Sequence, residues 1–195
     1  MSKLIKNRIE ESIATKNRIL DDEGLISRID EAANIIVDAY KRGNRFLLCG
    51  NGGSAGDAQH IAAELSGRYL IDLPPLDAEA LSVNTSYLTA VSNDYSYDEI
   101  FARMLRAQGH KGDVLLAIST SGNSKNILKA MDVAREKKMI SIALTGESGG
   151  KMKEKADLLL NVPSTETPRI QESHILIGHI ICEVIENSLF NSGNN

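Results

Sequence analysis

The sequence predicts an α/β fold, a parallel sheet of about five strands with helices on both faces. Short apolar runs, typical of strands that are buried on both faces, alternate along the chain with longer segments of helical periodicity. Two of these runs lead into a Gly-rich or a Ser-rich loop and then a helix, which is the layout of strand–loop–helix units in a parallel sheet. We therefore expect a three-layer sandwich formed by one domain, residues 1–195.

Two helices are expected before the first strand. Residues 3–20 place Ile5, Ile9 and Ile13 on one helical face, although no strand precedes them for that face to cover. This stripe would pack on the domain or on another subunit. The second helix is expected at 24–42, with a glycine directly after it as its C-terminal stop.

The alternating part of the chain then runs to a long final helix. Strands are expected at 45–49, 78–83, 114–118, 140–144 and 158–162. Helices are expected from Ser54 onward, at 85–91, at 97–108, from Ser124 to about 138, as a short helix after 150, and at 169–189. Paired prolines make 73–77 a connector. Asn93-Asp94 is expected to interrupt the helical segment between 85–91 and 97–108. Residues 190–195 are expected to be a flexible tail.

The composition is that of an ordinary globular protein, with 42% hydrophobic and 25% charged residues. The net charge is −4 and the basic residues form no stripe, so we expect no nucleic-acid partner. No apolar run reaches the roughly 18 residues of a membrane-spanning helix, so we expect no membrane segment. Cys49 and Cys182 fall in an expected strand and an expected helix and are interpreted as buried thiols, which indicates a cytoplasmic protein.

A hydroxyl-rich loop joins an expected buried strand to a helix N-terminus. It contains Ser119, Thr120, Ser121 and Ser124. Hydroxyls and backbone N–H groups at such a position can hold the oxygens of a phosphate, and open α/β sheets bind ligands at the carboxyl ends of their strands. A plain turn with Ser124 as N-cap is the simpler interpretation, but a cap needs only one serine. No lysine follows in the spacing of a nucleotide-binding P-loop.

A Gly-rich loop follows the first expected strand. Gly50, Gly52 and Gly53 allow a sharp turn and the close approach of a ligand, and Ser54 with Asp57 fits a capping box at the start of a helix. That helix N-terminus would attract an anion. The stretch also matches the Gly-x-Gly-x-x-Ala of dinucleotide-binding proteins, but the acidic residue at the expected distance precedes the connector instead of ending a strand.

Two pairs of possible metal ligands or acid–base groups lie on two expected helices. His60 and Glu64 stand four residues apart, on one face of the helix after the Gly-rich loop. Gln171 and His179 stand two turns apart on the last helix. An exposed pair and a core histidine are the simpler interpretations. Together the four could form a mixed nitrogen and oxygen cluster of the kind that binds zinc, and a buried carboxylate there would suit a general base.

Two further polar pairs have less specific signals. Asn93 and Asp94 could hydrogen-bond the hydroxyls of a polyol, or they could simply end a helix. Arg68 and Tyr69 could contact an anion or a sugar, although a surface ion pair of Arg68 is the simpler interpretation.

Eight motifs follow one another along nearly the whole chain. They are Cys-Gly-Asn-Gly-Gly-Ser at 49–54, Ala-Gln-His-x-Ala-Ala-Glu-Leu at 58–65, Gly-Arg-Tyr at 67–69, Asn-Asp at 93–94, Gly-Asp-Val-Leu-Leu at 112–116, Ser-Thr-Ser-Gly-Asn-Ser at 119–124, Leu-Thr-Gly at 144–146 and Arg-Ile-Gln-Glu at 169–172. Together they resemble the bacterial phosphoheptose isomerases of the sugar isomerase (SIS) domain superfamily. The resemblance implies a flavodoxin-like, SIS-type sandwich and an aldose–ketose isomerase. Its reaction would convert D-sedoheptulose 7-phosphate to D-glycero-D-manno-heptose 7-phosphate, the first step of ADP-heptose biosynthesis for lipopolysaccharide core or other surface glycans.

The resemblance also implies a set of site residues, a cofactor and an assembly. The family's metal ligands, which would hold one Zn²⁺ per subunit, correspond to His60, Glu64, Gln171 and His179, and its catalytic pair to Glu64 and His179. Its substrate contacts correspond to Asn51, Gly52, Gly53, Glu64, Asn93, Asp94, Ser119, Thr120, Ser121, Ser124 and Gln171. The family implies a homotetramer with active sites between subunits, so residues 1–43 are expected at an oligomer interface. Some members have Asp where this chain has Pro168, so no contact is carried over from that position.

The implied mechanism is proton transfer through an enediol. Glu64 would move the proton between C1 and C2, while His179 would serve the oxygens or a metal. Two alternatives remain open: a sugar-phosphate sensor without turnover, and a SIS-domain protein that associates with the replication initiator DnaA. DnaA-associating relatives lack the carboxylate at the position of Glu64 and the histidine at that of His179. Both residues are present here, which favours the enzyme.

Overall fold

The predicted parallel sheet is confirmed in the structure, a computed structural model that describes residues 2–190. Its strands are β1 (Phe46–Cys49), β2 (Ala78–Ala80), β3 (Val114–Ser119), β4 (Ile140–Thr145) and β5 (Leu158–Asn161). They lie in the order β2-β1-β3-β4-β5, and all neighbouring pairs are parallel. This is the flavodoxin-like order, in which the chain moves from β1 first to one side of the sheet and then to the other.

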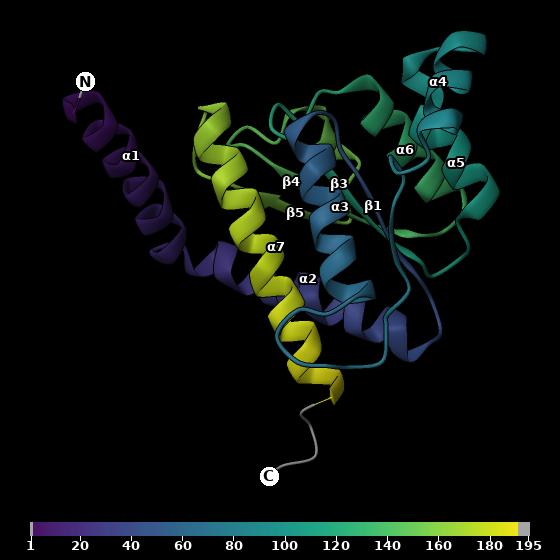
Figure 1. Ribbon diagram of the computed structural model, residues 1–195, viewed down its shortest axis with the longest axis horizontal. Helices are drawn as coiled ribbons and strands as arrows, with labels where there is room; N and C mark the ends of the chain where they lie inside the picture. Colours follow the sequence, from purple (N-terminus) through teal and green to yellow (C-terminus); the bar gives the residue numbers. More distant parts are fainter. Residues whose placement is uncertain (1, 191–195) are drawn as a thin grey trace.

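Helices cover both faces of the sheet, as predicted (Figure 1). One face is covered by α2 (Glu23–Lys41), α3 (Gly53–Ser66) and α7 (Thr167–Phe190). The other is covered by α4 (Thr85–Asp94), α5 (Ile100–Gln108) and α6 (Lys125–Glu136). Short 3₁₀ helices lie at Tyr97–Glu99 and Gly150–Glu154. No helix of residues 2–190 is both long enough and apolar enough to cross a membrane.

The strands supply two separate cores, because successive side chains of a strand point to opposite faces of the sheet. Phe46 and Leu48 pack with α2, α3 and α7, while Leu47 and Cys49 pack with α4, α5 and α6. The prediction of two buried, unpaired cysteines is confirmed. Burial, with the carboxylates of Glu64 and Glu186 nearby, raises the pKa of the Cys182 thiol to about 12, so this cysteine stays protonated at neutral pH.

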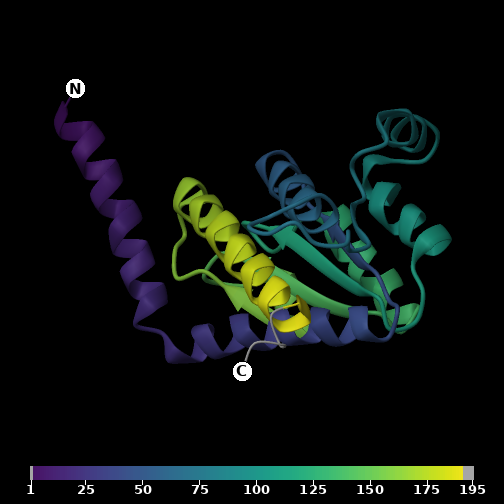
Figure 2. The same ribbon diagram turned by 60° about the horizontal axis from the view of Figure 1, so that its bottom comes forward.

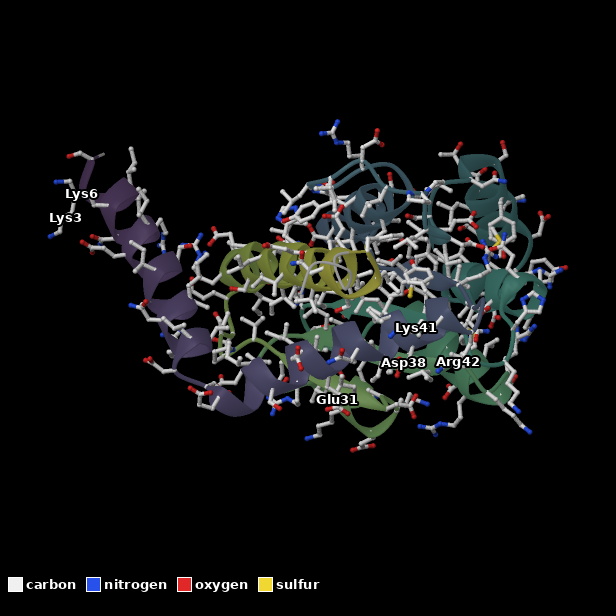
Figure 3. All side chains as sticks on the ribbon, turned by 90° about the horizontal axis from the view of Figure 1, so that it is seen from below. Lys3, Lys6, Glu31, Asp38, Lys41 and Arg42 are labelled. Carbon is white, nitrogen blue, oxygen red and sulfur yellow. The ribbon has the colours of Figure 1, made fainter. Side chains whose placement is uncertain are left out.

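The two N-terminal helices differ in what they cover. The apolar face of α2 lies in the core through Leu25, Ile29 and Ile36, and Figure 3 shows its charged residues along the outer side. In contrast, α1 (Ser2–Leu20) projects from the body of the molecule (Figure 2), and its apolar stripe stays exposed. The interface prediction for residues 1–43 therefore applies mainly to α1. The predicted tail falls outside the described residues except for Phe190, which ends α7.

The predicted start of α3 is wrong. Its N-cap is Gly52, with φ 55° and ψ −120°, a backbone conformation that side chains rarely adopt. Ser54 lies buried in the first turn, and no side-chain capping bond forms. The capping box was a wrong prediction because Gly52, with its positive φ, is the N-cap residue, and Ser54 therefore lies inside the helix.

Three other elements also differ from the prediction. The helix predicted at 85–91 extends three residues further, because α4 includes Asn93 and ends at Asp94, with Tyr95 as its C-cap. The following predicted helix is split into the 3₁₀ turn at Tyr97–Glu99 and α5. The second strand is shorter than 78–83, since β2 is an edge strand whose ladder with β1 ends at the pair Leu48 and Ala80.

We predict that α3 and α7 pack too closely to accept a side chain at Gly178. A Cβ there would lie 2.5 Å from Ile61 Cδ1 and 2.8 Å from Cγ1. Gly178→Val should therefore lower the free energy of unfolding by about 1–3 kcal/mol, as measured by chemical denaturation. Gly56→Ala on α3 is the control: a Cβ there meets nothing within 4 Å, so it should raise stability by about 0.4–1 kcal/mol. An unchanged stability for Gly178→Val would contradict this packing.

Candidate functional site

The sheet topology brings the two ligand-type loops to one place. β1 and β3 pair in parallel, with Cys49 opposite Ala117. The loops 50–53 and 119–124 follow the carboxyl ends of these two strands, so both lie at the same edge of the sheet. The chain goes to β2 on one side after the first loop and to β4 on the other after the second. Open α/β sheets bind ligands at such a switch point.

A pocket of about 100 Å³ lies between these loops. Ser124 occupies the N-cap position of α6 but makes no capping bond, and its Oγ lies 3.0 Å from the Oγ of Ser119. Ser124 is therefore the N-cap residue by position, but its hydroxyl does not serve as a side-chain cap. Hydroxyls at a helix N-terminus suit a phosphate. The lining residues are Asn51, Ser54, Ile118, Ser119, Thr120, Ser121, Ser124 and Gln171.

Gln171 reaches this pocket from α7, and a glycine makes room for it. A Cβ on Gly53 would lie 2.5 Å from the Nε2 of Gln171, so a larger residue would push the carboxamide away. Gly52 and Gly53 are both exposed at the start of α3. The structure thus brings six predicted substrate residues to one pocket, and Gly53 lies against one of them, Gln171.

Further along α3 and α7, three titratable side chains converge. His60 Nε2 lies 2.9 Å from Glu64 Oε1 and 3.5 Å from His179 Nε2. The ligand atoms of all three lie within 4.8 Å of one another. His60 is exposed, and the other two are partly buried. Two imidazole nitrogens and a carboxylate oxygen are a donor set that fits a divalent metal such as zinc.

Tyr69 and Leu70, which follow α3, lie beside the cluster. The ring of Tyr69 stacks on His179 with centroids 5.7 Å apart and planes at 23°. The next residue, Leu70, donates its backbone N–H to the buried carboxylate of Glu186, with both oxygens 3.3 Å away. Burial and the carboxylate of Glu183 raise the pKa of Tyr69, so its phenol stays protonated near neutral pH.

Asp57 lies on the face of α3 that carries Gly53, His60 and Glu64. Its Oδ2 is buried and has no hydrogen-bond partner among the described residues. Burial raises the pKa of this carboxyl, and His60 partly offsets the effect. Asp57 is therefore no part of a capping box, and it faces the same side as the cluster.

Three residues of the two remaining predicted pairs, Asn93, Asp94 and Arg68, belong neither to the pocket nor to the cluster, whereas Tyr69 stacks on His179. Asn93 and Asp94 are exposed at the end of α4, where the Nδ2 of Asn93 donates to Asp94 Oδ1 at 2.9 Å. Figures 1 and 2 show α4 well apart from α3 and α7. Their substrate contact stays a prediction. Arg68 is exposed and lines a small hollow beside Glu64.

The structure adds two residues that the sequence did not single out. Asn126, in the first turn of α6, and Tyr97 both hydrogen-bond the side chain of Asn51. Asn126 has a weak signal in the sequence, because it is an amide in a buried strand–loop–helix unit. Tyr97 has none, since it lies in an irregular segment.

Comparison with known proteins decides the family. Residues 9–146 match the SIS domain family. Phosphoheptose isomerase 2 of Campylobacter jejuni is 54% identical over 193 residues, which cover 99% of this chain and 96% of that protein. This chain belongs to the phosphoheptose isomerase family of SIS-domain proteins. The phosphoheptose isomerase of Sulfurimonas denitrificans is 51% identical over 195 residues, the full length of both.

The fold of this phosphoheptose isomerase family member agrees with its sequence relationship. Phosphoheptose isomerase GmhA from Neisseria gonorrhoeae superposes with a TM-score of 0.90 at 43% identity, covering 95% of this chain and 98% of that one. A phosphoheptose isomerase from Francisella tularensis gives the same TM-score at 38% identity. The family resemblance and the SIS-type fold expected from the sequence are both confirmed.

We predict that the metal-free chain binds a divalent metal through the His60, Glu64 and His179 cluster. Loss of one imidazole in His179→Ala should weaken the affinity for Co²⁺, followed by its absorption spectrum, by more than about 100-fold. His110→Ala is the matched control, because the side chain of His110 is 73% exposed and lies outside the cluster. Equal Co²⁺ affinity in the two variants would rule out this cluster as the metal site.

Proposed function

We propose that this chain is the enzyme that converts D-sedoheptulose 7-phosphate to D-glycero-D-manno-heptose 7-phosphate. The observation that carries the proposal is the position of Glu64, a carboxylate 2.9 Å from His60 and clustered with His179. A pocket rich in hydroxyls lies at the same edge of the sheet. Proteins that are 51–54% identical to this chain bear the name phosphoheptose isomerase. The product would enter ADP-heptose biosynthesis for lipopolysaccharide core or other surface glycans.

The phosphate end of the substrate is assigned to the pocket between the two loops. Ser119, Thr120, Ser121 and Ser124 present hydroxyls at the N-terminus of α6, where the positive end of the helix dipole favours an anion. The carbon chain would then extend along α3 and α7 toward the cluster. Gln171, which lines the pocket two turns before His179 on α7, would contact the sugar.

Proton transfer is assigned to Glu64 and His179. Glu64 takes a proton from C1 of the open-chain ketose and returns it to C2, so the carbonyl moves from C2 to C1. His179 gives a proton to O2 and accepts one from O1, which balances the charge through the enediol. Each such group contributes about 10²–10⁴-fold to the rate. Tyr69 holds the imidazole plane of His179 by stacking on it.

Zinc is the proposed cofactor, held by His60, Glu64, Gln171 and His179. A divalent ion there would stabilise the negative charge that develops on the two oxygens of the substrate. The nitrogen and carboxylate donors of the cluster fit zinc chemistry. Ligation and proton transfer compete for the same lone pairs of Glu64 and His179, so the two tasks have to be separated by measurement.

We predict that Glu64→Gln abolishes turnover while leaving sugar-phosphate binding. The amide keeps an oxygen for a metal or a hydrogen bond but cannot accept the C1 proton, so kcat should fall by at least about 10²–10⁴-fold. Turnover is followed by NMR with sedoheptulose 7-phosphate and metal-supplemented protein. Glu136→Gln, an exposed position at the end of α6, is the matched control. A kcat near that of the control would refute the base assignment.

The same assay separates the enzyme from its rivals. A sugar-phosphate sensor would bind sedoheptulose 7-phosphate without converting it. A protein of the DnaA-associating kind would show no turnover and would bind DnaA. The presence of Glu64 and His179 in one cluster supports the isomerase, because neither rival needs a base beside the bound sugar.

A homotetramer is part of the proposal, with α1 at an interface. Five large apolar residues on this helix are more than half exposed, and four of them form its stripe: Leu4, Ile5, Ile9 and Ile13. With residues of α7 they line a groove of about 570 Å³ between the two helices. A continuous apolar face of this kind indicates a protein contact.

We predict that Ile9→Glu shifts the assembly toward smaller species, because it places a charge in the apolar stripe. Size-exclusion chromatography with light scattering measures the change. Lys6→Glu puts the same side chain at a polar position of α1 and should leave the mass unchanged (Figure 3). An unchanged tetramer for Ile9→Glu would contradict the assignment of α1 to an interface.

A further inference from the structure

The side chain of Asn51 is held in a closed pair with Asn126. Asn51 Nδ2 donates to Asn126 Oδ1 at 2.9 Å, and Asn126 Nδ2 donates back to Asn51 Oδ1 at 2.8 Å. Tyr97 Oη donates to the same Asn51 Oδ1 at 2.9 Å. Asn126 is only 2% exposed, so its amide is shielded from water that could replace the partner.

The orientation of both amides follows from a backbone group. The N–H of Ile127 donates to Asn126 Oδ1 at 3.0 Å, which identifies that atom as the acceptor. The other end of the Asn126 amide must then be the NH₂ group, and it faces Asn51 Oδ1. The bond to Ile127 also satisfies one of the free N–H groups in the first turn of α6.

This pair connects the two loops that form the pocket. Asn51 lies in the loop after β1, and Asn126 lies two residues beyond Ser124 in the helix that follows the loop after β3. Tyr97 adds a third segment, the 3₁₀ turn after α4. The two bonds between Asn51 and Asn126 join the segments on either side of the pocket. The bond from Tyr97 holds Asn51 from the third segment.

The same bonds limit what Asn51 can offer a ligand. Its Oδ1 already accepts from two donors, and one hydrogen of its Nδ2 is used by Asn126. A free amide would bring an acceptor and two donors to a sugar. Here one N–H is left, so most of the bonding capacity of Asn51 serves the protein.

We propose that Asn126 and Tyr97 are positioning residues for substrate binding, which act by holding Asn51 and so fix the Gly-rich loop against the hydroxyl-rich loop. This inference rests on the proposed function for the identity of the substrate. Neither residue contacts the reacting carbons in this assignment. Their loss therefore weakens binding of the sugar phosphate and leaves the proton-transfer step intact.

The first test is the division of effects between KM and kcat for sedoheptulose 7-phosphate. Asn126→Ala removes both bonds to Asn51 and should raise KM about tenfold, while Tyr97→Phe removes one and should raise it about two- to fivefold. For both variants kcat should stay within about twofold. Tyr97→Phe keeps the ring, so it remains informative if Asn126→Ala folds poorly. An unchanged KM in Tyr97→Phe and in folded Asn126→Ala overturns the proposal.

A double-mutant cycle tests whether Asn51 acts through Asn126. If it does, Asn51→Ala, Asn126→Ala and the double variant should all raise KM by about the same factor, because each breaks the same pair. If Asn51 instead binds the sugar independently, the factors of the single variants multiply in the double variant, which overturns the proposal.

A matched asparagine controls for general loss of stability. Asn44 Nδ2 also makes two hydrogen bonds, to Lys111 O at 3.0 Å and Asp113 Oδ1 at 3.1 Å, at the opposite edge of the sheet. Asn44→Ala should lower the Tm without raising KM. An equal rise of KM in Asn44→Ala would show that the effect of Asn126→Ala is not local and would overturn the proposal.

Calorimetry with sedoheptulose 7-phosphate keeps this inference distinct from the isomerase proposal. If the unmodified protein binds the sugar phosphate but does not convert it, the isomerase proposal fails. Weaker binding by Asn126→Ala, with unchanged binding by Asn44→Ala, would then still support the positioning role. Equal binding by all three proteins would overturn it.

Discussion

The close packing of α3 against α7 is the contact on which the site depends. The two helices run side by side, with Gly53 against Gln171 near their starts and Ile61 against Gly178 further along (Figure 1). Glycine on one helix at each contact lets the other approach closely. His60 and His179 meet only because the axes are this near. A bulkier residue at Gly53 would push the carboxamide of Gln171 away, and one at Gly178 would push against Ile61 of α3.

The sheet and the two loops could be predicted from the sequence because their signals are local. The apolar run from Val114 to Ile118 predicts a buried strand without reference to the rest of the chain. The hydroxyl residues that follow it have no role in the core. The shared edge of the sheet then brings the loops together. Boundaries were less predictable: Ser54 fits a cap in sequence, but the positive φ of Gly52 starts the helix two residues earlier.

The site could be predicted only as far as residue types allow. The resemblance of the motifs to a known family predicted His60, Glu64 and His179. Spacing along one helix, however, cannot show which residue of another helix lies opposite a given residue. The partners of Asn51 are a clearer failure. Its hydrogen bonds come from residues 75 and 46 positions away, and no periodicity links them. Polar pairs across loops depend on the final packing, so a sequence contains no local signal for them.

The distance along the chain between His60 and His179, 119 positions, has a consequence for how the protein is made. All five strands precede the last helix in the chain, since β5 ends at Asn161 and α7 begins at Thr167. The cluster cannot form before this helix exists, because one of its three members arrives with it. During synthesis the His60, Glu64 and His179 cluster would therefore be completed last. If the cluster binds the proposed metal, binding would favour the docked position of α7 and thereby couple metal supply to the docking of that helix.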